Sequence, residues 1–253
     1  MNQLFDVTGK VVHVSGGSRG IGKAIALGLA EAGARVVVSA RTREALEATG
    51  LDYEVCDVTD AEAVERATAA IVARHGRLDV LFNVAGINFR YAAEVFPVNK
   101  FDDILDVNVR GNFLMARAAG RVMVGQRSGK IVNIASLHSH QSLAGVVAYG
   151  TSKGAIASMT RALAVEWAQH NVQVNAIAPG FIVTDLNAKL WEDPAMRGWV
   201  ESRTPAGRLG QTRDLIGAAL FLSSAASDFL TGQVLYVDGG FAAGSLWPLQ
   251  IPR

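Results

Sequence analysis

A tyrosine and a lysine four residues apart, Tyr149 and Lys153, are well suited to acid–base chemistry in this 253-residue chain. Side chains at this spacing share one face of a helix, so we expect the ammonium to lie near the phenol. A phenol has a reference pKa of about 10, and only nearby positive charge makes it a base near neutrality. Ser136, at the end of the segment KIVNIAS, offers a hydroxyl that could hydrogen-bond a substrate oxygen. The three residues predict removal of a proton from an alcohol while hydride leaves its carbon, or the reverse reduction of a ketone.

The segment SGGSRGIG at residues 15–22 offers two different chemistries. Its glycines are spaced like a phosphate-binding loop: Gly16 permits a tight turn, Gly20 lets the backbone approach an anion, and Gly22 lets the helix pack against the strand. The first N–H groups of a following helix would then hold a pyrophosphate. The same residues match G-x-S-x-G, which would make Ser18 the nucleophile of a serine hydrolase. The hydrolase alternative is the weaker one, because the strand would be the first of the sheet and no HGGG-like segment precedes it.

The end of the second predicted strand bears on which dinucleotide would bind. Its residues are Ser39-Ala40-Arg41, so the carboxylate that usually binds the ribose 2′-OH of NAD is missing. Arg41 and Arg19, which lies in the glycine loop, are suited to pair with a 2′-phosphate. The sequence therefore predicts that NADP(H) is preferred over NAD(H).

Composition and charge argue against several other classes of protein. Half of the residues are apolar, 19% are charged and the net charge is +1, which predicts a sizeable core without the basic footprint of nucleic-acid binding. No apolar run is long enough for a membrane span, and MNQLFDVTGK does not resemble a signal peptide. The single cysteine, Cys56, predicts a reducing, cytoplasmic location. His138 and His140 have no third ligand in view, so we expect no metal site.

Strands and helices alternate along the chain with short connections, which is typical of a parallel sheet covered by helices on both faces. The seven predicted strands are 10–15, 35–39, 53–56, 78–84, 130–135, 172–177 and 233–237. The predicted helices are 21–32, 42–49, one opened by a capping box of Thr59 and Glu62, 101–124, 150–169 and 211–223. We therefore expect an α/β protein, a single-domain Rossmann fold over residues 1–253 with a seven-stranded parallel sheet.

Residues 181–209 interrupt this alternation. They contain two prolines and two tryptophans, Trp191 and Trp199, that look exposed in the sequence. The segment follows Pro179-Gly180 at the strand ends where such sheets bind ligands. We expect it to form a lid over the substrate, and an ordinary surface loop is the alternative.

Taken in order, these motifs resemble those of the short-chain dehydrogenase/reductase family, from Gly9 to Gly240. The matching positions are Ser15-Gly16-x-x-x-Gly20-x-Gly22, Asp57, Asn83-x-Ala85-Gly86, Asn108 in DVNVRGNF, Ser136, Tyr149, Lys153, Pro179-Gly180-x-Ile182-x-Thr184 and the terminal VDGG. Ser15 stands where the family usually has threonine, and Val84 where it usually has a second asparagine.

The resemblance implies roles for these residues. Tyr149 is the acid/base, Ser136 orients the substrate, and Lys153 lowers the phenol pKa and holds the nicotinamide ribose. Asn108 anchors a water in the proton relay. The implied cofactor contacts are Gly16, Ser18, Gly20, Ile21 and Gly22 around the phosphates, Asp57 and Val58 at the adenine, Asn83 and Ala85 at the nearby ribose, and Ile182 and Thr184 at the carboxamide, with Gly86, Pro179 and Gly180 beside them.

The C-terminal third resembles the gluconate 5-dehydrogenases and related sugar-acid dehydrogenases of that family, in the segments 187–194, 203–208 and 214–240. In that resemblance Arg90 binds a substrate carboxylate, and His138 and His140 bind hydroxyls. A polyol or other sugar and a 3-oxoacyl thioester are alternative substrates, and a non-catalytic dinucleotide-binding protein is an alternative from another class.

Assembly is also implied by the resemblance. Members of the family are usually homotetramers, built through the two long central helices and the C-terminal edge. The tail FAAGSLWPLQIPR, with Trp247, is a candidate for crossing to a neighbouring subunit.

Overall fold

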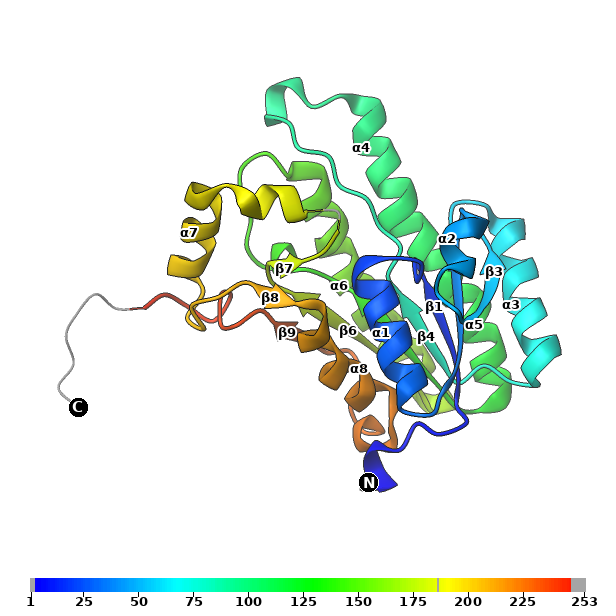
Figure 1. Cartoon of the computed structure of the whole chain (residues 1–253). Coiled ribbons are helices and arrows are strands. Elements are labelled where there is room, and N and C mark those ends of the chain that lie inside the picture. Colours follow the sequence, from blue (N-terminus) through cyan, green and yellow to red (C-terminus); the bar gives the residue numbers. More distant parts are fainter. Residues whose placement is uncertain (1–2, 186, 247–253) are drawn as a thin grey trace.

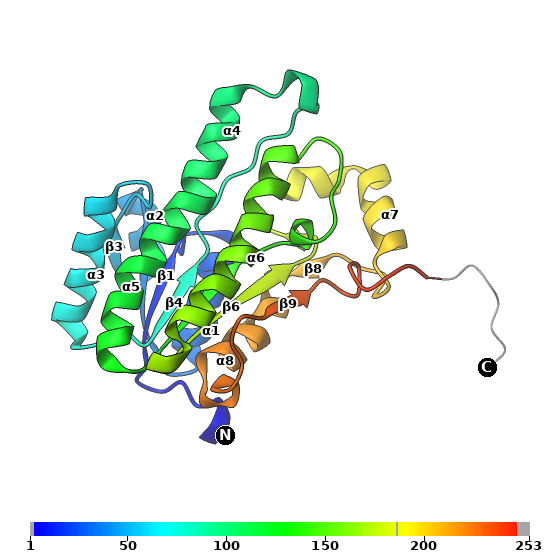
Figure 2. The same ribbon diagram turned by 180° about the vertical axis from the view of Figure 1, so that it is seen from behind.

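The computed structural model describes residues 3–185 and 187–246 and centres on a seven-stranded parallel sheet of order β3-β2-β1-β4-β5-β6-β9 (Figure 1). The strands are β1 (Val11–Ser15), β2 (Arg35–Ala40), β3 (Asp52–Val55), β4 (Val80–Asn83), β5 (Gly129–Ile134), β6 (Val172–Pro179) and β9 (Val234–Val237). Figures 1 and 2 show α1 (Gly20–Glu31) and α8 (Ile216–Ser223) on one face, and α3 (Ala61–His75), α5 (Asn112–Gln126) and α6 (Val147–Trp167) on the other. The short α2 (Arg43–Glu47) precedes β3. The predicted fold class is confirmed.

Two apolar cores hold these layers together. The central strands β1, β4, β5 and β6 are buried on both faces, so their β-branched and aliphatic residues supply both cores. Ile71, Leu81 and Met115 belong to the core under α3, α5 and α6. Ile25 and Leu222 belong to the core under α1 and α8. The strand order reverses between β1 and β4, and sheets of this kind bind ligands in the crevice at such a point.

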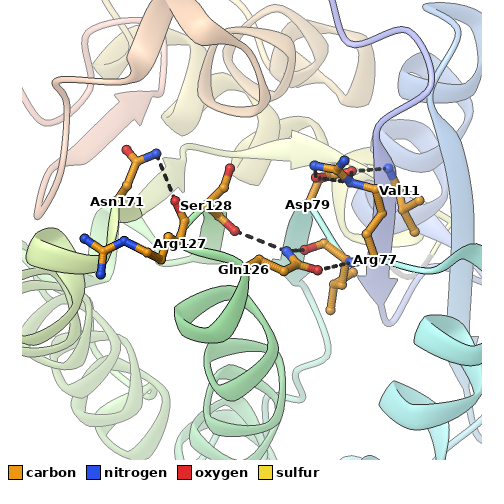
Figure 3. A network of polar contacts seen from close by, with 8 residues as sticks. Val11, Arg77, Asp79, Gln126, Arg127, Ser128 and Asn171 are labelled. Carbon is orange, nitrogen blue, oxygen red and sulfur yellow. Dashed lines mark hydrogen bonds and ion pairs between the residues drawn. The ribbon is translucent and has the colours of Figure 1, made fainter.

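Polar contacts hold the opposite, amino-terminal edge of the sheet (Figure 3). The Asp79 carboxylate accepts from the Val11 N–H at 2.9 Å and forms an ion pair with Arg77 at 2.6 Å. The Gln126 side chain accepts from the Leu78 N–H at 3.0 Å and donates to the Leu78 carbonyl at 2.8 Å. These bonds join the starts of β1 and β4 to the end of α5.

The helix predicted over 101–124 is wrong as a single element. The structure has α4 (Val98–Leu105), a π-helical stretch Asp106–Gly111 and then α5. Asn108 lies in this wider turn, and its side chain bonds the backbone of Ile87 in a distant loop. The spacing of apolar residues does not reveal such a long-range bond, and for this reason the sequence predicted a continuous helix.

Two helix starts also differ from their predictions. Helix α3 is capped by Asp60, whose carboxylate accepts from the N–H groups of Glu62 and Ala63. The predicted cap, Thr59, instead donates its hydroxyl to Asp57. Helix α6 begins at Val147, so Tyr149 lies in its first turn rather than before it.

Residues 181–209 fold into small elements that the sequence did not predict. Strand β7 (Ile182–Val183) pairs in parallel with β8 (Gly210–Gln211), and a 3₁₀ turn (Ala188–Glu192) and α7 (Pro194–Arg203) lie between them. Trp191 is only 7% exposed, which corrects the expectation that it faces solvent, and Trp199 is half-buried. The Phe181 ring contacts Trp191, Trp199 and Phe241 edge-on, with centroids 5.1–6.1 Å apart.

These ring contacts pack the segment 181–209 onto the ends of β6 and β9. Its role as a lid stays a prediction. Trp247 and the rest of the tail after residue 246 lie outside the described residues.

Candidate active site

Ser136, Tyr149 and Lys153 converge beyond the carboxyl end of β5. The Ser136 hydroxyl accepts from the His138 N–H at 3.2 Å and hydrogen-bonds the Tyr149 phenol. The Lys153 Nζ lies 5.5 Å from the centre of the Tyr149 ring and donates to the Ile134 carbonyl at 2.6 Å. The structure thus brings the three predicted residues together as an acid, a hydroxyl and a cation on adjoining elements.

Burial and neighbouring polar groups act on the pKa values of Tyr149 and Lys153. Burial raises the pKa of the phenol, while the hydrogen bond from Ser136 and the positive charge of Arg90 lower that pKa. Burial also lowers the pKa of the Lys153 ammonium to about 8. Ser136 and Arg90 thus join the groups that favour the phenolate, and the further lowering of the phenol pKa by Lys153 stays a prediction.

Asn108 joins the loop after β4 to the start of α6. Its Oδ1 accepts from the Ile87 N–H at 2.8 Å, and its Nδ2 donates to the Ile87 carbonyl at 2.9 Å and to the Ser152 Oγ at 3.0 Å. Ser152 in turn donates to the Tyr149 carbonyl at 2.7 Å. Sequence reasoning missed Ser152, whose only signal was its place between the tyrosine and the lysine. Whether Asn108 also anchors a water stays a prediction.

The glycine loop has a shape that side chains would fill. Gly16 has a φ of +69°, and a Cβ there would lie 2.7 Å from the Ala85 nitrogen, so the loops after β1 and β4 touch. A Cβ at Gly22 would overlap the Gly16 carbonyl, so the first turn of α1 also lies close against the loop. Arg19 caps α1 without a side-chain hydrogen bond. The cradle and the open N–H groups of the first helical turn fit the phosphates of a dinucleotide.

The other predicted phosphate contacts surround this loop. The side chains of Arg19 and Arg41 are exposed, and Ser18 is half-buried. A Cβ at Gly20 would lie 3.7 Å from the Thr184 side chain, which places the end of β7 opposite the loop. Thr184 is held there by its N–H, which donates to the Asn187 Oδ1 at 2.8 Å.

The predicted adenine and ribose contacts fall into two groups. Asp57 follows β3, and its carboxylate accepts from the Thr59 N–H and hydroxyl. Val58 is buried against Gly111. The Asn83 amide, by contrast, is buried and donates to the Asn133 Oδ1 at 3.0 Å and to the Asn112 carbonyl at 3.2 Å. This amide nitrogen joins β4 to its neighbours, while the buried Oδ1 has no hydrogen-bond partner among the described residues, and a ribose contact of Asn83 stays a prediction.

The remaining predicted positions border the same end of the sheet. Ile21 lies in the first turn of α1, Ala85 and Gly86 follow β4, Pro179 ends β6, Gly180 packs on the backbone of Asp238, and Ile182 is buried in β7.

Two of the three predicted substrate-binding side chains lie beside Tyr149. The His138 ring packs edge-on against the tyrosine ring, with centroids 5.8 Å apart and an interplanar angle of 82°. Arg90 lies in the loop after β4, and its positive charge lowers the pKa of both Tyr149 and His138; burial is the larger cause of the lowered histidine pKa. His140 is exposed.

Among the described residues, none of the helices is long and apolar enough to cross a membrane.

Comparison with known proteins adds to this geometry. A family model described as enoyl-(acyl carrier protein) reductase matches residues 16–242. Gluconate 5-dehydrogenase of Gluconobacter oxydans is 42% identical over 246 residues, which cover 94% of this chain and 96% of that protein. The 2-dehydro-3-deoxy-D-gluconate 5-dehydrogenase of Pseudoalteromonas atlantica is 41% identical over 253 residues, covering 95% and 99%.

A solved structure shares the fold over 96% of this chain. The gluconate 5-dehydrogenase from Burkholderia cenocepacia, in complex with NADP and tartrate, superposes with a TM-score of 0.92 at 39% identity and covers 96% of this chain and 98% of that one. Together with the converging serine, tyrosine and lysine, these similarities show that the chain belongs to the short-chain dehydrogenase/reductase family and is an NAD(P)-dependent oxidoreductase.

Proposed function

We propose that this enzyme interconverts a secondary hydroxyl and a keto group on a sugar acid, with gluconate and 5-ketogluconate as the best-supported pair. The observation that carries the proposal is the position of Arg90, whose charge acts on both Tyr149 and His138. Arg90 is exposed and forms no ion pair within the described part of the chain, so its guanidinium is available to a substrate carboxylate. The names of the relatives from G. oxydans and P. atlantica support a sugar acid.

The nicotinamide ring of the bound cofactor supplies the hydride acceptor or donor. In alcohol oxidation Tyr149 takes the hydroxyl proton as the carbonyl forms, and in ketone reduction it returns that proton. Ser136 donates a hydrogen bond to the reacting oxygen and so positions it at the phenol. Lys153 is held by the Ile134 carbonyl on the same side of the site, where its ammonium can reach a ribose hydroxyl.

The substrate class is tested by replacing Arg90 with glutamine and assaying sugar acids, polyols and acetoacetyl thioesters with NADP(H). The loss of a charge-assisted hydrogen bond should raise the KM for sugar acids about ten- to a hundredfold and leave the KM for polyols nearly unchanged. Lys100→Gln, which removes a cation already paired with Asp103, is the control. Turnover of acetoacetyl thioesters or polyols, with none of gluconate or 5-ketogluconate, would contradict the proposal.

We also propose that NADP(H) is preferred over NAD(H). The exposed guanidinium of Arg41 follows β2, where an NAD-binding site usually has a carboxylate, and homologous structures with bound NADP support the same choice. Arg41→Ala should raise the KM for NADP about tenfold or more and change the KM for NAD little. Arg43→Ala, which loses a hydrogen bond and a cation–π contact with Tyr53, is the matched control. A wild-type KM for NAD at or below that for NADP would overturn the preference.

We further propose that the enzyme is a cytoplasmic homotetramer. Exposed apolar side chains on α5 and α6, Phe113, Val147 and the 82% exposed Val165, support contact with a second copy through these helices (Figure 2). Two exposed rings, Phe229 before the edge strand β9 and Tyr236 within it, support a second contact. The buried Cys56, the one cysteine of the chain, suits a reducing compartment.

A further inference from the structure

The hydrogen bond of His138 determines which of its ring nitrogens carries the proton. Its Nδ1 lies 3.3 Å from the backbone carbonyl of Gln141. A carbonyl oxygen only accepts, so the contact is a hydrogen bond only when Nδ1 is the donor. Burial and, less strongly, the charge of Arg90 lower the pKa of the ring, although the hydrogen bond to Gln141 opposes them, and the net lowering favours the neutral ring at pH 7. A neutral ring with its proton on Nδ1 has a lone pair on Nε2.

The same ring lies beside both residues that hold the reacting oxygen. It packs edge-on against Tyr149, and the backbone N–H of His138 donates to the Ser136 hydroxyl. Within the described residues Nε2 has no hydrogen-bond partner, and it is not among the buried polar atoms left unpaired. The lone pair is therefore accessible close to where a substrate carbinol meets Tyr149.

We infer that His138 Nε2 is a fixed hydrogen-bond acceptor that selects substrates with a hydroxyl on a carbon next to the reacting one. A polyhydroxylated acid offers such a donor. A 3-oxoacyl thioester offers only carbonyl acceptors near its keto carbon, and it would leave the nitrogen unpaired and desolvated. This inference rests on the proposed sugar-acid activity, and it assigns that activity a residue that discriminates between the candidate substrates.

The protonation of the ring is tested without any substrate. Long-range ¹H–¹⁵N correlation spectra of the full-length protein at pH 7 report which histidine nitrogens carry protons, and His138→Phe identifies the signals of His138. We expect a neutral ring with the proton on Nδ1. A ring protonated on Nε2, or on both nitrogens, would overturn the inference whatever the enzyme acts on.

The selectivity is tested by comparing 5-ketogluconate with its deoxy analogues at the two carbons that flank the keto group. We expect the wild-type kcat/KM to fall about ten- to a hundredfold for at least one analogue. His138→Phe keeps the ring contact with Tyr149 but has no acceptor. In this variant the kcat/KM values for 5-ketogluconate and the deoxy analogue should differ by no more than about threefold. His138→Gln, whose amide reaches the position of Nε2, should keep part of the ratio.

His170→Phe, the same exchange at the far end of α6, is the control and should show the wild-type ratio. Retention of the wild-type ratio in His138→Phe would overturn the inference. Failure of every variant and of the wild type on sugar acids would instead overturn the proposed function, and the spectra would still decide the state of the ring.

Discussion

Lys153 is the residue at which stability and catalysis conflict. Its side chain is almost fully buried, its Nζ bonds the Ile134 carbonyl, and burial lowers its pKa from 10.5 to about 8. At pH 7 the lysine is charged in both the folded and the unfolded chain, so folding bears the full cost of burying the charge. In the proposed mechanism, the chemistry of a charged lysine beside the phenol is therefore gained at the expense of stability.

The conflict predicts a pH dependence of stability. Between pH 8 and 10.5 the unfolded chain binds more protons at this site than the folded one, so the unfolding free energy rises with pH in this window. Relative to Lys153→Met, the wild type should gain about 2 kcal/mol between pH 7 and pH 9.5. Urea unfolding followed by circular dichroism measures this difference, with Lys100→Met as the control. A difference that stays constant over this range would contradict the buried charge.

At the scale of elements, the glycine loop holds three segments in contact. Gly16 touches the loop after β4, Gly22 touches Gly16, and Gly20 faces the end of β7. The strand and the helix are specified by local periodicity, but the gap between them exists only because these positions lack a Cβ. A side chain added at Gly16 or Gly22 should push the neighbouring segment away and so weaken cofactor binding.

Gly22→Ala tests this dependence. The added Cβ would meet the Gly16 carbonyl, so α1 must shift away from the loop and spoil the phosphate cradle. We expect the KM for NADP to rise about tenfold or more, measured by absorbance at 340 nm with saturating substrate. Gly125→Ala in α5 is the control: nothing lies within 4 Å of its Cβ, so it should leave the KM unchanged and stabilise the helix by about 0.5–1 kcal/mol. If Gly22→Ala keeps the wild-type KM for NADP, the close contact between Gly22 and Gly16 is not needed for cofactor binding.

At the scale of the whole molecule, the two edges of the sheet have different tasks. The amino edge is held by the bonds of Asp79 and Gln126 (Figure 3), while the carboxyl edge holds the glycine loop, the acid–base residues and the segment after β6. Helices α5 and α6 form the outer face behind the site, and Asn108 and Ser152 link that face to Tyr149. An assembly through these helices would therefore support the site from behind.

The proposed assembly predicts the effect of a charge on that face. Sedimentation of the wild type should give four copies, and Val165→Glu should lower that number because it would place a charge between apolar surfaces. Val55→Glu, on the edge strand at the other end of the sheet, is the control and should leave the assembly intact. A monomeric wild type would contradict the proposal.

The sequence by itself determined the α/β fold, the place of the glycine loop between strand and helix, and the pairing of Tyr149 with Lys153. Each of these depends on consecutive residues: the period of apolar side chains, the spacing of glycines and one turn of helix. Helix boundaries were less secure, because capping by Asp60 rather than Thr59 is a choice between neighbouring side chains that periodicity does not register.

Only the tertiary structure decided what surrounds the acid–base group. The charge of Arg90 acts on Tyr149, and Asn108 bonds Ser152; both pairs are far apart in the chain. The hydrogen bond of His138 joins its ring to the Gln141 carbonyl in the next turn. Burial and hydrogen bonding set these properties, and both depend on how distant segments pack. The sequence therefore determined which reaction class the chain belongs to, and the packing decided the charge and hydrogen-bonding state in which each group meets a substrate.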